Sequence, residues 1–222
     1  MLTMVADHLR YLWPAADGLF IPGRLAFPLF CLAIAVNIGR GRPGTLVCYA
    51  NARYLGWLLV FSLVSEAPYR WLDNGSATLN VIPTLTLGLL VAWGVHYRQP
   101  LAWLLAASAA VCATLASEHL MYGLPGVLLP AACLTARQQG GLVWLLPCTL
   151  AAAGNLTNSW LAAHLLQPVT LVILATAALA LPLGNALLQQ QRWAVAPVGR
   201  WGYGFYPLHL LALKGLLWLN LV

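Results

Sequence analysis

Charged residues are scarce in this chain of 222 residues. Only 7% of them are Asp, Glu, Lys or Arg, whereas 61% are hydrophobic. A soluble domain usually carries roughly a quarter charged residues. This composition excludes an ordinary soluble domain. It predicts an all-α fold, a polytopic helical membrane bundle formed as one domain over residues 1–222.

Several common catalytic and metal-binding motifs are missing as well. The sequence has no P-loop, no HExxH and no GxSxG, which disfavours nucleotide hydrolysis, a zinc protease and an α/β hydrolase. The five cysteines show no CxxC spacing, and we interpret them as buried, inert thiols. No metal is therefore expected. The opening residues lack a basic start, so they do not read as a cleaved signal peptide.

The net charge of +6 does not point to nucleic acid. The eleven Lys and Arg residues stand singly between apolar segments, whereas a surface that follows phosphates needs them clustered. We interpret them instead as markers of membrane topology.

Apolar runs divide the chain into about nine membrane segments. A spanning helix needs about 20 apolar residues, so the shorter segments are expected to be tilted, half-length or re-entrant. The first would extend only roughly 18 Å. The expected segments are 2–13, 22–39, 53–67, 79–97, 101–117, 122–136, 141–155, 169–188 and 203–222.

The arginines between these segments predict an orientation. Seven lie in the even-numbered connections and three in the odd-numbered ones, which places the N-terminus and the even connections in the cytoplasm. The seven are Arg40, Arg42, Arg53, Arg98, Arg137, Arg192 and Arg200, and the three are Arg10, Arg24 and Arg70.

An acid and an imidazole interrupt the first apolar run, at Asp7 and His8. Ionisable groups in such surroundings are costly unless they pair or do chemistry. Adjacent residues of a helix point about 100° apart, so we expect two separate roles. His8 would be a general base and Asp7 would orient another group, either Arg24 or a second histidine. The alternative is a buried polar pair that ties helices together.

Other polar residues stand at the ends of apolar segments. Arg24 could pair with Asp7, bind an anionic group of a substrate, or anchor the chain at the interface. His209 lies near the middle of the last segment, as a functional group or as a satisfied core residue. Glu66, Asn80, Glu118 and Tyr122 could each be a loop or capping residue, yet together with Arg24 they suggest a polar cavity that opens away from the cytoplasm. Asn155-Leu-Thr157 matches a glycosylation sequon, a pattern with little meaning outside a secretory context.

At these residues the sequence resembles the TraX family of conjugative pilin acetylases, including its TrbP-type members. The motifs that carry the resemblance run in the family order along nearly the whole chain. They are Leu2-Thr-Met-Val-Ala-Asp7-His8, Gly23-Arg24-Leu-Ala-Phe27-Pro28-Leu-Phe30, Ser65-Glu66-Ala-Pro68-Tyr69, Leu79-Asn80-Val, Tyr122-Gly123-Leu-Pro125-Gly126 and Phe205-Tyr206-Pro207-Leu-His209-Leu. Family members usually have more apolar residues before the Asp-His pair, so the N-terminus is expected to be clipped.

The resemblance implies transfer of an acetyl group from acetyl-CoA to the N-terminal amine of mature pilin at the bacterial inner membrane. It implies catalytic roles for Asp7, His8 and His209, and a substrate site lined by Arg24, Glu66, Asn80 and Tyr122. CoA carries phosphates and would enter from the cytoplasm, so Arg40, Arg42, Arg53 and Arg200 are candidate contacts for it.

The residues suit this chemistry. His8 could take the proton of an attacking amine, while Arg24 or Tyr122 could stabilise the oxyanion. Direct transfer is preferred, and a covalent acyl-imidazole on His8 or His209 is the alternative. Two other functions stay open: another pilin-maturation reaction, such as head-to-tail peptide transfer, or a non-catalytic pilin assembly chaperone. A permease is a further alternative, disfavoured because no paired broken helices are evident in matching halves of the sequence.

Overall fold

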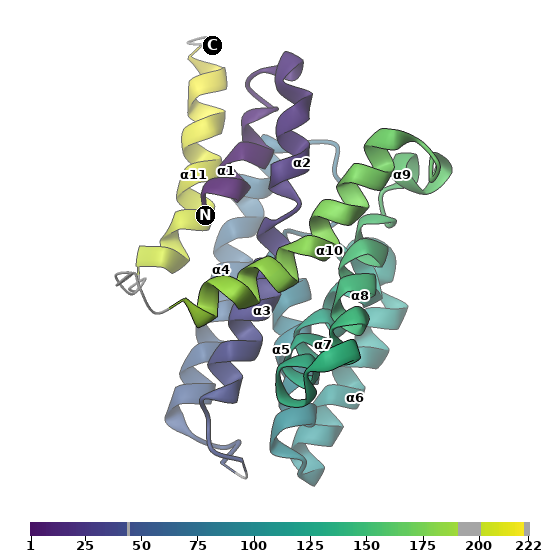
Figure 1. Cartoon of the computed structure of the whole chain (residues 1–222). Helices are drawn as coiled ribbons and strands as arrows, with labels where there is room; N and C mark the ends of the chain where they lie inside the picture. The colour runs from purple at the N-terminus through teal and green to yellow at the C-terminus, as the bar shows by residue number, and fades with distance from the viewer. Residues whose placement is uncertain (44, 191–200, 220–222) are drawn as a thin grey trace.

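The computed structural model describes residues 1–43, 45–190 and 201–219, and within them the chain forms helices and no strand (Figure 1). The longer helices lie side by side, and one of them, α10, crosses the others obliquely. In chain order the elements are α1 (Leu2–Leu9), η1 (Pro14–Leu19), α2 (Phe20–Gly23), α3 (Ala26–Gly39), α4 (Tyr49–Leu72), α5 (Val81–Tyr97), α6 (Pro100–Leu115), η2 (Ser117–His119), α7 (Gly123–Gln139), η3 (Gly141–Trp144), α8 (Leu145–Asn155), α9 (Ser159–Ala163), α10 (Pro168–Gln189) and α11 (Trp201–Trp218).

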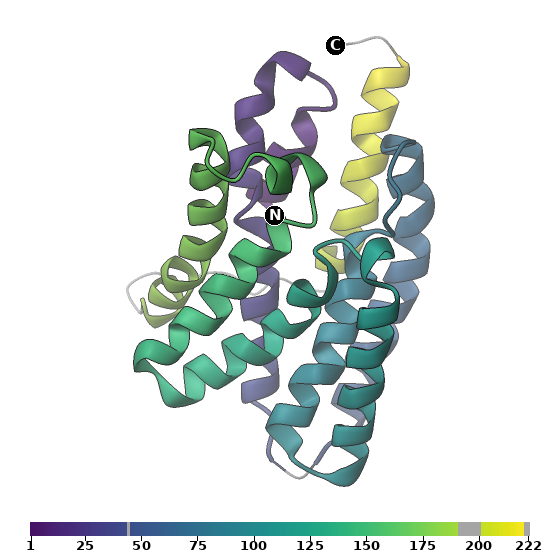
Figure 2. The ribbon, with the colours of Figure 1, turned by 90° about the vertical axis from the view of Figure 1, so that its right-hand side faces the viewer.

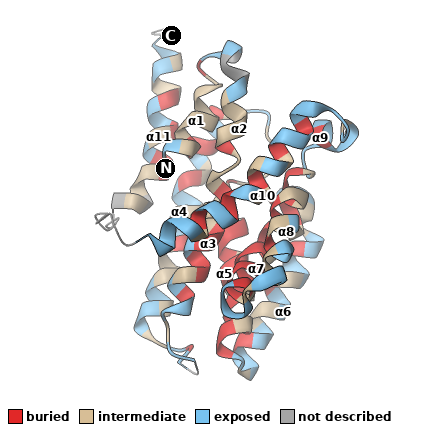
Figure 3. Cartoon of the chain, viewed as in Figure 1, coloured by how far each residue is buried: buried red, intermediate tan, exposed pale blue. Residues whose placement is uncertain are grey.

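Helix α5 is the centre of the bundle, because it packs against α3, α4, α6 and α7. Small residues let these helices approach closely, as is common between membrane helices. A Cβ atom placed on Gly88 would lie 2.8 Å from Pro130 of α7, and one placed on Gly94 would lie 2.6 Å from Ala106 of α6. The buried side chains accordingly concentrate on α3, α5 and α7 (Figure 3).

The remaining long helices flank this centre as two pairs. Helix α11 packs against α4, and α10 packs against α8. Figure 2 shows the two pairs on opposite sides of the bundle. Large apolar side chains such as Leu183 and Leu187 of α10 are exposed on the outside, which is the arrangement expected where lipid surrounds a bundle.

Two helical stretches of the described residues are long and apolar enough to cross a membrane, judged by length and composition. They are Phe20–Gly39 and Pro168–Gln189, with mean hydropathies of 1.7 and 2.1. Three shorter helices are also strongly apolar: Val81–Tyr97, Pro100–Leu115 and Gly141–Asn155. The all-α fold expected from the sequence is confirmed, and its helices are compatible with a membrane bundle.

Each expected apolar segment contains a helix, but several boundaries differ. Helix α1 ends at Leu9, so its eight residues extend about 12 Å. Helix α4 runs through Pro68 to Leu72, past the expected end at residue 67. Its last turns are supported by the ion pair between Glu66 and Arg70, four residues apart. The short helix α9 was not predicted.

The second expected segment is divided at Arg24 and Leu25. Their N–H groups donate to Ile21 and Pro22, three residues back, as in a tight turn. Pro28 has no N–H to donate to the carbonyl of Arg24. The α-helical hydrogen bonds of α3 therefore start with the N–H of Leu29, which donates to Leu25. The break places Arg24 just before the N-terminus of α3, beside α1.

Candidate active site

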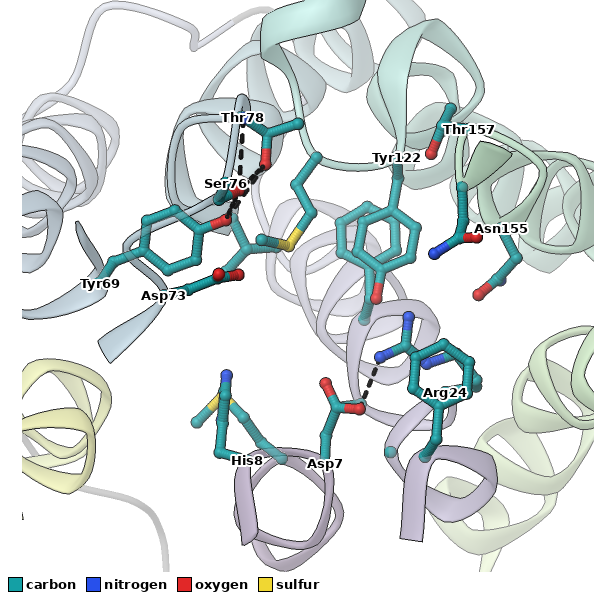
Figure 4. Close-up of a pocket in the computed structure, with 18 of the residues that line it drawn as sticks. Asp7, His8, Arg24, Tyr69, Asp73, Ser76, Thr78, Tyr122, Asn155 and Thr157 are labelled. Atoms are coloured by element: carbon teal, nitrogen blue, oxygen red, sulfur yellow. Dashed lines mark hydrogen bonds and ion pairs between the residues drawn. The ribbon is translucent and has the colours of Figure 1, made fainter. Parts of the chain in front are cut away.

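A cavity of about 520 Å³ lies where α1 and α2 meet the α4–α5 connection, the start of α7 and the α8–α9 connection (Figure 4). These elements are far apart in the sequence, so the cavity is a product of the tertiary fold. Four of the residues proposed from the sequence line it: Asp7, His8, Arg24 and Tyr122. Of the residues expected to form a polar cavity, Arg24 and Tyr122 line this one, whereas Glu66, Asn80 and Glu118 do not.

Asp7 and Arg24 form an ion pair in the wall of this cavity. The Arg24 Nη2 atom donates to Asp7 Oδ1 at 2.7 Å, and the two side chains are 12% and 17% exposed. Gly23 permits the close approach of α2 to α1, because a Cβ atom there would lie 2.5 Å from the Cβ of Asp7. The guanidinium also stacks on Phe20, with 3.9 Å between Cζ and the ring centroid. Of the two partners considered for Asp7, the structure selects Arg24.

His8 contacts the second histidine instead. Its Nδ1 atom lies 3.0 Å from Nε2 of His209, and Nδ1 of His209 lies 2.9 Å from the carbonyl oxygen of Phe205. A carbonyl oxygen only accepts, so His209 carries its proton on Nδ1 and its Nε2 is an acceptor. The Nδ1–H of His8 then donates to His209. For two neutral rings, the lone pair of His8 Nε2 stays available.

The two histidines have different positions relative to the cavity. His8 lines it, and one of its ring nitrogens points into it (Figure 4). His209, in α11, is not among the lining residues; it packs behind His8, with 5.0 Å between the ring centroids. In this arrangement His209 contacts His8 and does not line the cavity.

Tyr122 forms the opposite wall. Its ring stacks on Phe27 with 3.9 Å between centroids, and its hydroxyl points toward Arg24 (Figure 4). Its backbone is left-handed, with a φ of 67°, a conformation that is uncommon for a bulky residue and that concentrates at functional sites. A Cβ atom on Gly126 would lie 2.6 Å from that of Tyr122, so the glycine one turn later is required by this placement.

The α4–α5 connection supplies a polar rim that the sequence did not predict. The hydroxyl of Tyr11 donates to Asp73 at 2.9 Å, which joins the end of α1 to this connection. Tyr69 lies 2.6 Å from Ser76 and 3.1 Å from Thr78, measured between hydroxyl oxygens. Tyr69 was part of a recognised motif, but nothing in the local sequence of Ser76 and Thr78 distinguished them from ordinary connection residues.

Glu66 and Asn80 are neighbours, but they do not line the cavity. Asn80 caps α5 by accepting from the N–H of Ile82, and its amide donates to Glu66 Oε2 at 2.7 Å. Glu66 also binds Arg70, whose Nη1 donates to the carbonyl of Ser76 at 2.8 Å. The pair therefore joins α4 to α5 and holds the connection that forms the rim.

The glycosylation-like triplet is also part of the site. Asn155 and Thr157 line the cavity, and Asn155 is only 3% exposed. A sequon-like spacing therefore marks a pocket wall here and not an accessible attachment site. The spacing was the one signal that drew attention to these residues.

A second, mostly apolar cavity of about 330 Å³ adjoins the first. The two share Met4, Phe30, Val81 and Tyr206, which form the partition between them. The second cavity reaches Tyr54 and Leu58 of α4 and Gly202 of α11. It extends toward the first half of α4, away from the polar rim.

The arginines proposed as CoA contacts lie away from the polar cavity. Arg40 follows α3 at the end opposite Arg24, roughly 21 Å along the helix, and Arg42 lies in the connection after it. Arg53 lies in the first turns of α4, with its guanidinium 5.4 Å from the ring centroid of Tyr49. Arg200 lies outside the described residues.

The cavity combines a base with hydrogen-bond donors and aromatic walls. These groups could take a proton from a nucleophile and stabilise a developing negative charge. Within the part of the chain that the structure describes, no group of three or more His, Cys, Asp or Glu side chains could hold a metal ion.

The family model described as "TraX protein" matches residues 1–217 of the 222. No curated protein and no solved structure gives a significant match. The family match implies a conjugation-related protein that modifies pilin, and the apolar helices support its placement in a membrane. With nearly its whole length covered, this chain belongs to the TraX family.

Proposed function

We propose that this protein is a multi-pass N-acetyltransferase of the bacterial inner membrane, formed as one domain over residues 1–222. It would transfer the acetyl group of acetyl-CoA to the N-terminal amine of conjugative pilin. The observation that carries the proposal is the orientation of His8, whose free ring nitrogen faces a cavity that also contains Arg24 and Tyr122.

The proposed reaction is one direct transfer. The neutral amine attacks the carbonyl carbon of the thioester, and a C–N bond forms as His8 Nε2 accepts the proton of the amine. The carbonyl oxygen becomes negative and is stabilised by an N–H of Arg24 or by the hydroxyl of Tyr122. The C–S bond then breaks, and the departing sulfur receives the proton held by His8.

Two residues would act through others. His209 accepts the Nδ1–H of His8 at 3.0 Å, which fixes the ring so that Nε2 faces the amine. Asp7 holds Arg24 at 2.7 Å, so that the guanidinium is positioned before the substrates arrive. Glu66 and Asn80 would act at one further remove, because they hold the α4–α5 connection.

We propose that the thioester donor approaches through the second cavity. Its apolar lining suits the pantetheine chain of the donor. The lining residues that it shares with the polar cavity include Met4, one turn before His8. Arg53 directly precedes Tyr54, a lining residue of this cavity, which supports a contact between Arg53 and the phosphates. Arg40 and Arg42 would be further contacts for them. Donor and acceptor would then approach from opposite ends of the bundle.

The test is the mass of pilin in cells that carry His8→Ala. We expect the variant to reach the membrane in normal amounts and pilin to lack the acetyl increment, because the base is gone. The matched control is His164→Ala, a half-buried histidine outside both cavities, which should leave pilin fully acetylated.

Other outcomes favour the rival functions. Acetylated pilin in the His8→Ala cells would refute the role of His8. Wild-type pilin that is lighter by one water and carries no acetyl group would indicate head-to-tail peptide transfer. If the His8→Ala variant leaves the mass of pilin unchanged but co-purifies less pilin than the wild-type protein does, an assembly chaperone is indicated.

A further inference from the structure

Two residues that line the main cavity each carry a buried polar atom that lacks a partner. Among the described residues, five buried side-chain nitrogen or oxygen atoms have no hydrogen bond, and two of the five belong to residues of this cavity: Nε of Arg24 and Oδ1 of Asn155. Burial of a polar group without a partner costs free energy. Such atoms in a cavity wall therefore point to a ligand that supplies the missing bonds.

The identity of the Asn155 atom is fixed by its other hydrogen bond. Nδ2 of Asn155 lies 2.9 Å from the carbonyl oxygen of Ala151, and a carbonyl oxygen requires a donor. The free atom is therefore the amide oxygen, an acceptor. In Figure 4 the amide of Asn155 points toward the side of the cavity where Arg24 lies.

The two free atoms have opposite requirements. Nε of Arg24 needs an acceptor, and Oδ1 of Asn155 needs a donor. A phosphate or carboxylate would satisfy only Arg24, while an ammonium group would satisfy only Asn155. A peptide unit satisfies both, because its C=O accepts and its N–H donates.

The position of these atoms relative to the base fits the N-terminus of a polypeptide. Asp7 precedes His8 directly and binds Arg24 at 2.7 Å, and all three residues line the same cavity. In a polypeptide the first peptide unit is separated from the terminal amine by a single Cα atom. An amine beside His8 therefore carries a peptide unit toward Arg24 and Asn155.

We propose that Arg24 Nε and Asn155 Oδ1 form a subsite for the first peptide unit of the acceptor chain. This inference rests on the proposed function, since it names how the acceptor is held for acetylation. It assigns the site to a polypeptide N-terminus and not to a simple amine without a second polar group. The neighbouring Thr157 already donates its hydroxyl proton to the carbonyl oxygen of Gly154, so it has no proton to offer the first peptide unit.

The experiment measures binding and transfer separately, with purified protein in nanodiscs. The probes are two synthetic pentapeptides with the N-terminal sequence of mature pilin: one has a normal first peptide bond, and the other has an ester in its place. The ester lacks the N–H that Asn155 would accept. We expect the wild-type protein to bind the ester about tenfold more weakly, and to acetylate it with a correspondingly lower kcat/KM.

The variant Asn155→Leu tests the assignment to this side chain. It should bind the two peptides with affinities within about twofold, because the acceptor that discriminates them is gone. The matched control is Thr149→Val, which changes a threonine of the same helix α8 that lines neither cavity and should keep the tenfold preference.

The remaining outcomes overturn the subsite or the function separately. Equal binding of both peptides by the wild-type protein refutes the subsite, and this result needs no variant to fold. A preference that survives in Asn155→Leu also refutes it, as does a lack of binding of either peptide. A preference for the amide without any acetyl transfer supports the subsite and refutes the acetyltransferase.

Discussion

At the scale of single residues, the site depends on a chain of hydrogen bonds that begins at a backbone carbonyl. Phe205 accepts from His209, and His209 accepts from His8. Each acceptor determines which nitrogen of the next ring carries a proton, so the backbone of α11 sets the protonation of a base on α1. Under the proposed function, His209 would therefore orient His8 and would not contact a substrate.

Substitution of His209 tests this role. Gln places an oxygen acceptor near the position of Nε2, whereas Phe offers none. We expect His209→Gln to keep kcat/KM within roughly tenfold of the wild-type value, and His209→Phe to lose about a hundredfold. Kinetics with acetyl-CoA and a pilin peptide measure both values. Equal losses in the two variants would indicate that His209 has another role.

Residues differ in how far the sequence reveals them. Asp7, His8 and Arg24 could be predicted because ionisable groups inside apolar runs are costly and rarely accidental. Asn155, Ser76 and Thr78 could not, because polar residues at helix ends are ordinary, and only the folded bundle decides which ends meet. The arginine contacts proposed for CoA stay predictions.

At the scale of elements, the cavity is built from helix ends and connections. Helices α3, α5 and α7 supply a rigid centre, and their lengths followed from the apolar runs of the sequence. The break between α2 and α3 did not, because it depends on two short-range hydrogen bonds and on Pro28. That break sets the position of Arg24, so a local irregularity that the apolar pattern does not encode determines the site.

The contact between α1 and α2 gives an element-scale prediction. Gly23→Ala would place a methyl group 2.5 Å from the Cβ of Asp7 and force the two helices apart. We expect a loss of roughly 1–3 kcal/mol in stability. Acetylation should fall about tenfold or more, because Asp7 and Arg24 no longer meet correctly. Thermal unfolding in detergent and pilin acetylation measure the two effects.

The control for this substitution is Gly56→Ala, in the interior of α4. A Cβ atom there meets nothing within 4 Å, and alanine favours a helix over glycine by up to about 1 kcal/mol. This variant should be as stable as the wild-type protein or more so, with normal acetylation. If the two variants show the same stability and the same acetylation of pilin, the close approach at Gly23 does not matter for function.

At the scale of the whole molecule, the structure explains the exceptions to the charge asymmetry. Each of the three arginines in the odd-numbered connections has a carboxylate partner. Arg10 lies 3.9 Å and Arg24 2.7 Å from Asp7, and Arg70 lies 2.7 Å from Glu66. Among the described arginines of the even connections, no such ion pair occurs. Arg10, Arg24 and Arg70 therefore lie at the cavity or in the contacts that hold its rim. Without them, every arginine lies in an even-numbered connection, so the charge asymmetry supports one orientation more clearly than the count of seven against three.

This asymmetry predicts that the α3–α4 connection faces the cytoplasm and that the α4–α5 connection faces the opposite side. In a variant without the five native cysteines, Asn74→Cys should react with a membrane-impermeant maleimide in intact cells. Thr45→Cys should react only after the cells are permeabilised. Both positions are exposed in the structure, so differences in labelling report the side of the membrane.

Asp73, Ser76 and Thr78 lie on the rim of the polar cavity, so this result would place the acceptor's approach outside the cytoplasm. The reverse labelling would show that the bundle has the opposite orientation in the membrane. The pilin N-terminus would then approach from the cytoplasmic side.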